Sequence, residues 1–353
     1  MKSAALAILA LASLAPAARS APEGAAVASV RVALKVDTSE AEAVLAILDA
    51  RAAGKAVAEE SWRKLFETEP YRRLKAREES LRVGFSDGDF RNFVLSDALG
   101  GKRQSLRSTL SRWKSADLDA AAARALAYLP PTAVIRASVY PMIKPKTNSF
   151  VFETATNPAI FLYLDPQVPA GKFQNTVAHE LHHIGFASVP DPRAARAADP
   201  KVAAALEWFG ALGEGFAMLA AAGSPDVHPH AASPARDRER WDRDMVQFNR
   251  DLRSLERFFR DVLEGKLGPR EKVDEAGAAF FGEQGPWYTV GYRMAVVIEK
   301  HEGRAALIAC MSDPKKLLET YDRDAAGATE GGEALALWSP ELIEKLGRPD
   351  PPR

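Results

Sequence analysis

The sequence contains Asn175-Thr-Val-Ala-His179-Glu180-Leu-His182-His183-Ile-Gly-Phe186, and this stretch decides the expected fold. On an α-helix His179 and His183, four residues apart, leave the same face about one turn, or roughly 6 Å, apart. Both imidazoles can therefore bind one metal ion, and the neighbouring Glu180 can take a proton from water at that ion. The apolar positions of the stretch indicate a buried helix over residues 170–187: Val177, Leu181, Ile184 and Phe186.

The metal hypothesis needs a third ligand, because His-Glu-x-x-His occurs by chance in about one chain in a hundred of this length. Zinc in hydrolases usually takes three protein ligands and keeps one position for water. Downstream, Glu207 and Glu214 lie seven residues apart on the helix expected from residue 194 or 201 to residue 222. Glu214 is favoured, because Gly213 and Gly215 beside it leave room for another helix, whereas glycine otherwise costs helix stability. Glu207 stays an alternative ligand.

Composition limits the partners of the chain. Its 353 residues include 47 Lys and Arg and 47 Asp and Glu, so the formal net charge is zero. A nucleic-acid-binding protein usually has a basic excess, so no nucleic-acid partner is expected. Cys310 is the only cysteine, which excludes an internal disulfide and a lipoprotein anchor near the N-terminus.

The N-terminus is typical of a secretory signal peptide over residues 1–20. Met1-Lys2 precedes an apolar run at residues 4–14, and Ala15-Pro-Ala17 and Ala18-Arg-Ser20 are small-x-small cleavage sites. The apolar run is too short for a membrane-spanning helix, and no other stretch is expected to span a bilayer. We therefore expect an exported protein, secreted or retained in a bacterial envelope.

The remaining pattern indicates an α+β fold that is mainly α. Three short runs rich in Val, Ile, Phe and Tyr predict strands at residues 133–143, 149–153 and 160–164. Ser39-x-x-Glu42 predicts a capping box at the first helix, and an apolar stripe predicts one long helix over residues 236–262. Four regions are expected in order: a signal peptide (1–20), an N-terminal helical region (21–130), a core (131–303), and C-terminal helices and tail (304–353).

Two motifs together resemble a known group. His-Glu-Leu-His-His at residues 179–183, followed by Glu-Gly-Phe-Ala at residues 214–217, is similar to the gluzincin superfamily of zinc metallopeptidases and to its aminopeptidase branch. The layout over about residues 61–303, with Tyr288-x-x-Gly-Tyr292 near its end, resembles bacterial families known only as candidate zinc-dependent peptidases. The specific motifs occupy three short windows of this length.

The resemblance implies a zincin-like catalytic core with a small mixed sheet and metal-binding helices. It implies His179, His183 and Glu214 as zinc ligands, Glu180 as general base, and a tyrosine that stabilises the oxyanion. Tyr288 is favoured for the last role, because the turn at Gly285-Pro286 can direct it into a cleft; Tyr292, one turn deeper, is the alternative. The resemblance also implies that an extended substrate pairs with an edge strand, for which residues 160–164 are the candidate.

This sequence departs from the aminopeptidase pattern in two respects. The gap from His183 to Glu214 is longer, which keeps Glu207 open as the ligand. The amine-recognising sequence Gly-x-Met-Glu-Asn is absent, so exopeptidase activity is not expected.

Four further side chains are candidates for minor roles. His182 can donate a hydrogen bond near the site, contact substrate, or simply pack at the helix edge, and Asn175 can form a hydrogen bond one turn before His179. His228 and His230, in a proline-containing loop, are expected to be solvated rather than to bind metal.

The expected function is a secreted zinc metallopeptidase acting on a peptide or protein. The alternative is a non-catalytic, zinc-containing envelope binding protein, although such a protein would not need Glu180. A zinc hydrolase acting on a non-peptide amide or ester also fits the motif.

Overall fold

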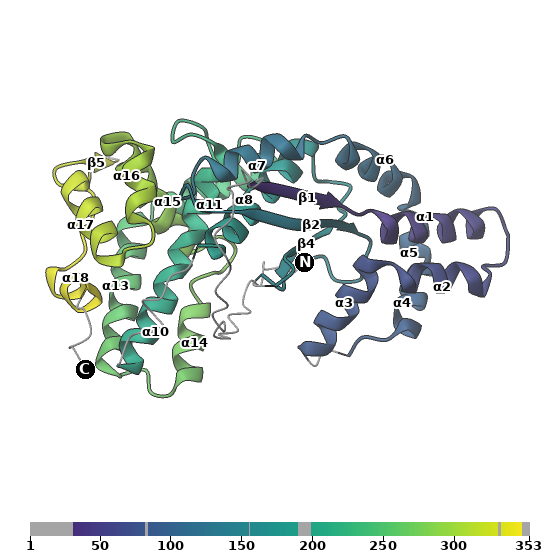
Figure 1. The fold of residues 1–353 in the computed structure, drawn as a ribbon, viewed down its shortest axis with the longest axis horizontal. Coiled ribbons are helices and arrows are strands. Elements are labelled where there is room, and N and C mark those ends of the chain that lie inside the picture. The colour runs from purple at the N-terminus through teal and green to yellow at the C-terminus, as the bar shows by residue number, and fades with distance from the viewer. Residues whose placement is uncertain (1–30, 82–83, 155, 190–198, 331–332, 348–353) are drawn as a thin grey trace, which may run out of the picture. The chain divides into compact units, whose positions relative to one another are not determined.

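The computed structural model describes residues 31–81, 84–154, 156–189, 199–330 and 333–347 (Figure 1). The expected signal peptide and the tail beyond residue 347 lie outside the described residues. As predicted, the described part is mainly helical with a small mixed sheet. The chain forms two compact units, Met1–Ala116 with Val134–Ala170, and Asp117–Ala133 with Gly171–Arg353.

The first unit contains a four-stranded sheet of order β1-β2-β4-β3. Strands β1 (Val32–Val36), β2 (Ile135–Met142) and β4 (Ala159–Tyr163) run parallel, and β3 (Phe150–Phe152) pairs antiparallel with β4. We predicted β2, β3 and β4 from the sequence but not β1, a short strand whose residues are half-buried or exposed.

The expectation that residues 160–164 form an edge strand is wrong. Strand β4 hydrogen-bonds β2 on one side and β3 on the other, so both of its backbone edges are occupied. The short connection between β3 and β4 folds β3 back along the side that would otherwise be free. The edges of this sheet are β1 and β3.

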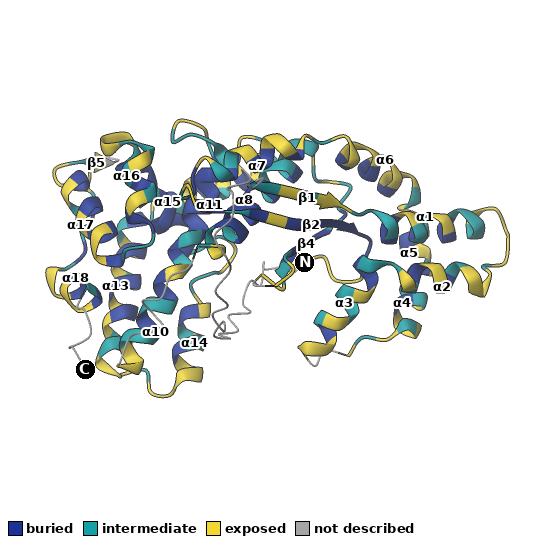
Figure 2. Ribbon diagram, in the orientation of Figure 1, coloured by how far each residue is buried: buried dark blue, intermediate teal, exposed yellow. Residues whose placement is uncertain are grey.

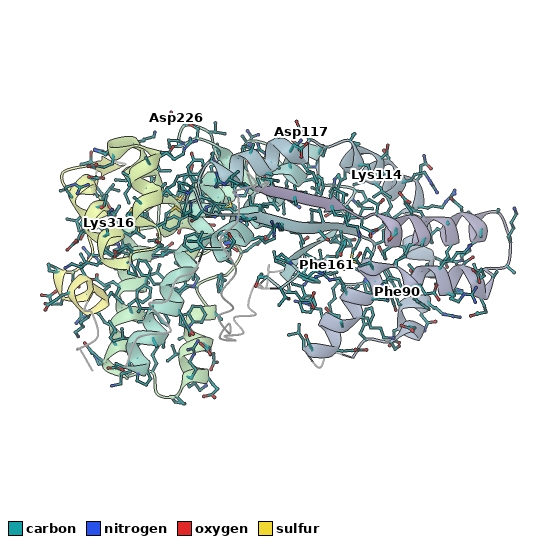
Figure 3. The ribbon with its side chains drawn as sticks, viewed as in Figure 1. Phe90, Lys114, Asp117, Phe161, Asp226 and Lys316 are labelled. Atoms are coloured by element: carbon teal, nitrogen blue, oxygen red, sulfur yellow. The ribbon has the colours of Figure 1, made fainter. Side chains whose placement is uncertain are left out.

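Six helices complete the first unit: α1 (Ser39–Ala52), α2 (Glu59–Glu67), α3 (Glu69–Ser80), α4 (Asp87–Val94), α5 (Asp97–Gly100) and α6 (Arg103–Lys114). Their aromatic side chains include Phe90, and Phe161 lies in the sheet (Figure 3). Strand β1 precedes α1 and pairs with β2, so this unit's sheet combines residues from both sides of its helices in the sequence.

The predicted capping box at Ser39 is wrong. Ser39 is the first helical residue of α1, and Thr38 is the N-cap, without a side-chain bond to the backbone. The carboxylate of Asp37 instead accepts a hydrogen bond from the Ser39 amide at 2.9 Å, while Thr38 Oγ1 donates to Glu42 at 2.8 Å. Glu42 is therefore engaged by a side chain rather than by a backbone amide.

The second unit is built from helices, with a short hairpin of β5 (Thr329–Glu330) and β6 (Glu333–Ala334). Helix α8 (Ala170–Ala187) has the bounds that the sequence predicted, and the Asp117 side chain caps the start of α7. The other elements are α7 (Leu118–Leu126), α10 (Pro200–Phe209), the 3-10 turn η1 (Gly210–Leu212), α11 (Gly213–Ala222), α12 (Ala235–Met245), α13 (Phe248–Glu264), α14 (Arg270–Ala278), α15 (Pro286–Glu302), α16 (Arg304–Cys310), α17 (Pro314–Ala325) and α18 (Pro340–Gly347).

Helix α15 lies in the core of this unit, and most of its length is buried (Figure 2). Trp287 at its start is fully buried and stacks on Trp208 of α10 at a centroid distance of 6.0 Å. The indole nitrogen of Trp287 donates to the Gly277 carbonyl at 2.9 Å, so burial of this ring leaves no donor unpaired.

The long helix expected over residues 236–262 is two helices. Helix α12 ends at Met245 and α13 begins at Phe248, and the Val246 side chain between them is 81% exposed. The apolar side chains keep a spacing of three to four residues across the break, at Trp241, Met245, Phe248 and Leu252. The apolar stripe therefore does not indicate where the helix breaks.

One stretch of the described chain, Pro200–Ala222, is long and apolar enough to cross a membrane by length and composition. This stretch was not expected from the sequence. It comprises α10, η1 and α11, and most of it is buried inside the protein. Burial in the core of the second unit accounts for its hydropathy.

Candidate metal centre

Helices α8 and α11 bring three candidate ligands together in the second unit. His179 Nε2 lies 3.1 Å from Glu214 Oε2 and 3.1 Å from His183 Nε2, and His183 Nε2 lies 3.3 Å from Glu214 Oε2. His179 and Glu214 are buried, and His183 is partly exposed. Among the described residues, this is the group of histidine, cysteine and acidic side chains whose geometry could hold a metal ion.

The separations match those of zinc ligands. Nitrogen and oxygen ligands about 2.0–2.1 Å from a tetrahedral zinc lie about 3.3 Å from one another. The three distances of 3.1, 3.1 and 3.3 Å are close to this value, and the three atoms converge on one point. Two histidines and one carboxylate are also a ligand set that zinc hydrolases use.

Glu207 does not join this group. Its carboxylate pairs with Arg270 of α14 at 2.5 Å, and one helical turn plus the 3-10 turn η1 separates it from Glu214. The structure therefore brings together His179, His183 and Glu214, the set that the sequence favoured, and leaves the alternative outside it.

The position of Glu214 depends on a close approach of α11 to α15. A Cβ atom on Gly215 would lie 1.9 Å from the backbone nitrogen of Tyr292, and one on Gly291 would lie 2.2 Å from the Leu212 carbonyl oxygen. Only glycine fits at either position. Gly213, in contrast, has open space where its Cβ would be, so only one of the two glycines flanking Glu214 serves helix packing.

Tyr288 lies at the group of ligands. Its hydroxyl donates a hydrogen bond to Glu214, and its ring stacks on that of His179 at a centroid distance of 6.3 Å. Burial raises the pKa of Tyr288, and the negative charges of Glu214 and Glu180 raise it further. The hydroxyl therefore stays protonated and can donate a hydrogen bond.

Tyr292, the alternative, packs elsewhere. Its ring meets Trp241 of α12 edge to face, with centroids 5.2 Å apart. The motif Tyr288-x-x-Gly-Tyr292 includes Gly291, but no role was predicted for this glycine. A glycine in the middle of an apolar helix is costly, and this cost was the signal that another backbone packs there.

Glu180 is fully buried, and neither carboxylate oxygen has a hydrogen-bond partner among the described residues. Burial raises its pKa, while the positive charge that His179 and His183 can carry opposes the rise. A buried carboxyl group without partners is costly for stability. Its raised pKa also makes it a better carrier of a proton near neutral pH.

The remaining histidines lie outside the ligand group. His182 is buried, its ring stacks on Phe186 at 6.4 Å, and burial lowers its pKa to about 3, so it is neutral. His228 Nε2 contacts Asp242 at 3.0 Å, and His230 Nδ1 contacts Ser233 at 3.1 Å. His230 is buried, contrary to the expectation that it is solvated.

Asn175 is half-buried on α8, one turn before His179.

The pKa values of the candidate ligand Glu214 and of its neighbour Glu180 shift in opposite directions. Burial by itself would raise the pKa of Glu214, but contact with His183 and His179 lowers it well below the ordinary value. Glu214 is therefore ionised, as a metal ligand must be.

A family model described as "Putative zinc dependent peptidase (DUF5700)" matches residues 62–328, or 267 of the 353 residues. The match includes all three candidate ligands and the tyrosines of α15. No curated protein and no solved structure matches the chain.

Proposed function

The chain belongs to the "Putative zinc dependent peptidase" family, and on this premise we propose that it is a zinc metallopeptidase of the gluzincin type that hydrolyses peptide bonds. The observation that carries the proposal is the group of His179, His183 and Glu214 beside the unpaired carboxylate of Glu180. The two histidines and Glu214 would hold the zinc ion.

When bound, zinc would polarise the scissile carbonyl and lower the pKa of a water molecule toward about 7. Glu180 takes the proton of the attacking water and passes it to the leaving amine nitrogen. Both of its oxygens are available for this transfer, because neither is engaged by another described residue. Its raised pKa favours its holding the proton between the two steps.

The Tyr288 hydroxyl donates to the substrate carbonyl oxygen as that oxygen gains negative charge. In the substrate-free protein this hydroxyl donates to Glu214, so it must turn from the ligand to the substrate. The ring, which stacks on His179, keeps the hydroxyl close to the ligands throughout.

A non-catalytic zinc protein would retain the three ligands but would have no use for Glu180. A buried carboxyl group without a partner lowers stability, and apolar or amide side chains of similar size would avoid this cost. The burial of Glu180 therefore favours the hydrolase over the binding protein.

We also propose that the protein is exported after removal of residues 1–20. The support is the charged start, apolar run and small-x-small sites of that segment. Determination of the N-terminal residue of protein recovered from the periplasm or the medium tests it, since retention of Met1 in the cytoplasm would contradict export.

The hydrolase is tested by metal analysis combined with digestion of a mixed peptide library, with products identified by mass spectrometry. We expect one zinc per chain and cleavage that 1,10-phenanthroline abolishes and added zinc restores. Stoichiometric zinc without cleavage of any peptide would support the binding protein. Cleavage confined to non-peptide esters or amides would support the third alternative.

A further inference from the structure

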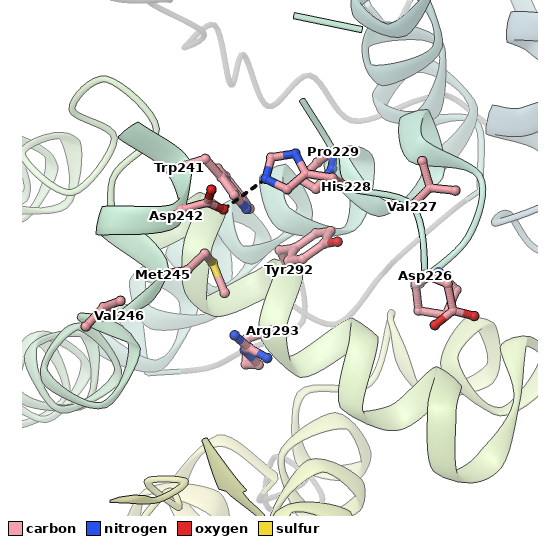
Figure 4. A pocket seen from close by; sticks show the side chains of 11 residues that line it. Asp226, Val227, His228, Pro229, Trp241, Asp242, Met245, Val246, Tyr292 and Arg293 are labelled. Carbon is pink, nitrogen blue, oxygen red and sulfur yellow. Dashed lines mark hydrogen bonds and ion pairs between the residues drawn. The ribbon is translucent and has the colours of Figure 1, made fainter. Parts of the chain in front are cut away.

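A pocket of about 370 Å³ lies between α12, α15 and the loop that follows α11 (Figure 4). Trp241 and Met245 come from α12, and Tyr292 comes from α15. Its volume is within the range of roughly 300–1,000 Å³ that is typical of ligand-binding pockets. The other lining residues are Pro225, Asp226, Val227, His228, Pro229, Asp242, Val246 and Arg293.

Helix α15 connects this pocket with the metal centre. Tyr288 and Tyr292 lie four residues apart on it, and therefore about one turn, or roughly 6 Å, apart along the axis. Tyr288 contacts Glu214, whereas Tyr292 lines the pocket. An extended peptide advances about 3.3 Å per residue, so the two tyrosines are separated by the length of about two peptide residues.

The rim of the pocket has two large apolar side chains exposed to solvent, Val227 at 40% and Val246 at 81%. Large hydrophobic residues are exposed at five positions in the described chain, and the other three are Val36, Leu81 and Leu95. Two of the five thus border a single pocket whose interior contains Trp241, Met245 and Tyr292. Exposed apolar groups gathered around a concave surface mark a binding site.

The charged side chains that line the pocket, Arg293 included, already have partners within the protein. Asp242 contacts His228 at 3.0 Å, shown by the dashed line in Figure 4, and Asp226 pairs with Lys300 at 3.0 Å. Both carboxylates therefore already have partners. Trp241, Met245 and Tyr292 provide the buried apolar part of the lining, and the thioether of Met245 adapts to side chains of different shape.

We infer that this pocket anchors an uncharged apolar side chain, aromatic or large aliphatic, of the peptide that the protein cleaves. The link to cleavage rests on the proposed function; the binding of an apolar side chain does not. The pocket determines specificity, because a peptide with a charged side chain at the corresponding position would have to desolvate that charge against Trp241, Met245 and Tyr292.

Binding is measured with N-acetyl-phenylalanine amide, N-acetyl-lysine amide and N-acetyl-aspartate amide at millimolar concentrations, by saturation-transfer NMR on the full-length mature protein. We expect the phenylalanine amide to bind and the other two to bind at least about tenfold more weakly. Val246→Asp and Val227→Asp should each weaken binding of the phenylalanine amide about tenfold, since each adds a charge to the apolar rim. Both side chains are exposed, so neither change should affect folding.

The matched control is Val36→Asp, a second exposed valine that does not line the pocket, together with Val246→Leu; both should bind the phenylalanine amide normally. Absence of binding to the unmodified protein, or equal binding by Val246→Asp and Val36→Asp, would overturn the inference. The inference would also be overturned if the protein sediments as a dimer, Val246→Asp dissociates this dimer, and the amide fails to bind. The surface would then be a contact between two copies of the chain.

Cleavage of the peptide library separates this inference from the proposed function. If both hold, Val246→Asp reduces the preference for apolar residues at one position near the cleaved bond and leaves zinc content unchanged. If no peptide is cleaved but the phenylalanine amide binds as described, binding of an apolar side chain in the pocket is supported and the proposed peptide hydrolysis is contradicted. If Val246→Asp cleaves peptides with the same apolar preference as the wild type, the proposed role of the pocket is contradicted, while the proposed hydrolase activity is not.

Discussion

Gly215 of α11 and Gly291 of α15 face each other where the two helix backbones come into contact. A Cβ on Gly215 would overlap the backbone of residues 291 and 292, and one on Gly291 would lie 3.2 Å from the Gly215 Cα. Glu214 precedes the first glycine and Tyr288 lies one turn before the second, so this contact places the carboxylate beside the tyrosine hydroxyl. The metal centre depends on a packing relationship between two residues without side chains.

Gly215→Ala should separate the two helices. Its methyl group would have to displace backbone atoms, so the free energy of unfolding should fall by about 3 kcal/mol or more, the upper range for overpacking, and zinc affinity should fall with it. Gly213→Ala is the matched control two residues away, because open space surrounds that position and alanine is the better helix former. Urea unfolding and zinc titration of both variants check this, and equal stability of the two would contradict it.

Glu214→Gln should weaken zinc binding on the order of 10²-fold or more, since even the outer partners of metal ligands contribute about 10–100-fold. Glu207→Gln makes the same chemical change in the same stretch of chain but affects only the ion pair with Arg270, so zinc affinity should be unchanged. Competition with a chromophoric chelator measures both affinities. If Glu207→Gln loses zinc and Glu214→Gln retains it, the ligand assignment is wrong.

Tyr288→Phe should lower kcat about 10- to 1,000-fold with zinc content and folding intact, a loss of roughly 1.4–4 kcal/mol in transition-state stabilisation. The ring that stacks on His179 is retained, and only the hydroxyl is lost. Steady-state kinetics on one cleaved peptide measures the effect. An unchanged kcat, together with a large decrease for Tyr292→Phe, would transfer the role to Tyr292.

Glu40 should make stability depend on pH. Its side chain is fully buried, Oε2 accepts a hydrogen bond from the Ile143 amide at 3.0 Å, and burial raises its pKa from 4.5 to about 8 against that bond and the charge of Lys144. Between these pH values the folded state keeps a proton that the unfolded state has lost, so the contribution to stability falls as pH rises.

The measurement compares the wild type with Glu40→Gln by urea unfolding at pH 5 and pH 7. The buried Lys144, whose pKa burial lowers to about 7, also titrates near the upper end of this range, but it is present in both proteins, so the comparison isolates Glu40. The wild type should lose roughly 2–3 kcal/mol relative to the variant between pH 5 and pH 7, at about 1.4 kcal/mol per pH unit. Parallel pH profiles of the two proteins would show that Glu40 is ionised in the folded state.

Much of the second unit could be predicted from the sequence, because its signals are local. The bounds of α8 follow from apolar residues at helical spacing, and the N-cap side chains Asp117 and Asp313 at the starts of α7 and α17 are local signals of the same kind. The convergence of His179 and His183 needs only helix geometry. The choice of Glu214 over Glu207 was a preference based on neighbouring glycines, and the structure supplies the reason in Gly215 alone.

The features that the sequence did not indicate depend on residues far apart along the chain. Strand β1 pairs with β2, about 100 residues later, and its short alternation of Val32, Leu34 and Val36 was not recognised as a strand. The central place of β4 depends on β3 folding back along it. The break at Val246 leaves the apolar stripe in register, and the pocket beside it forms only when α12 meets α15.

If Glu180 acts as the base of a zinc hydrolase, as we propose, its loss must reduce kcat of the Glu180→Gln variant at confirmed zinc content. Glutamine has nearly the same size but cannot take a proton, so zinc should remain at one per chain while kcat falls on the order of 10²–10⁴-fold. Glu207→Gln, the same substitution away from the ligands, should turn over normally. A zinc-loaded Glu180→Gln protein with near-normal kcat would show that Glu180 is not the general base.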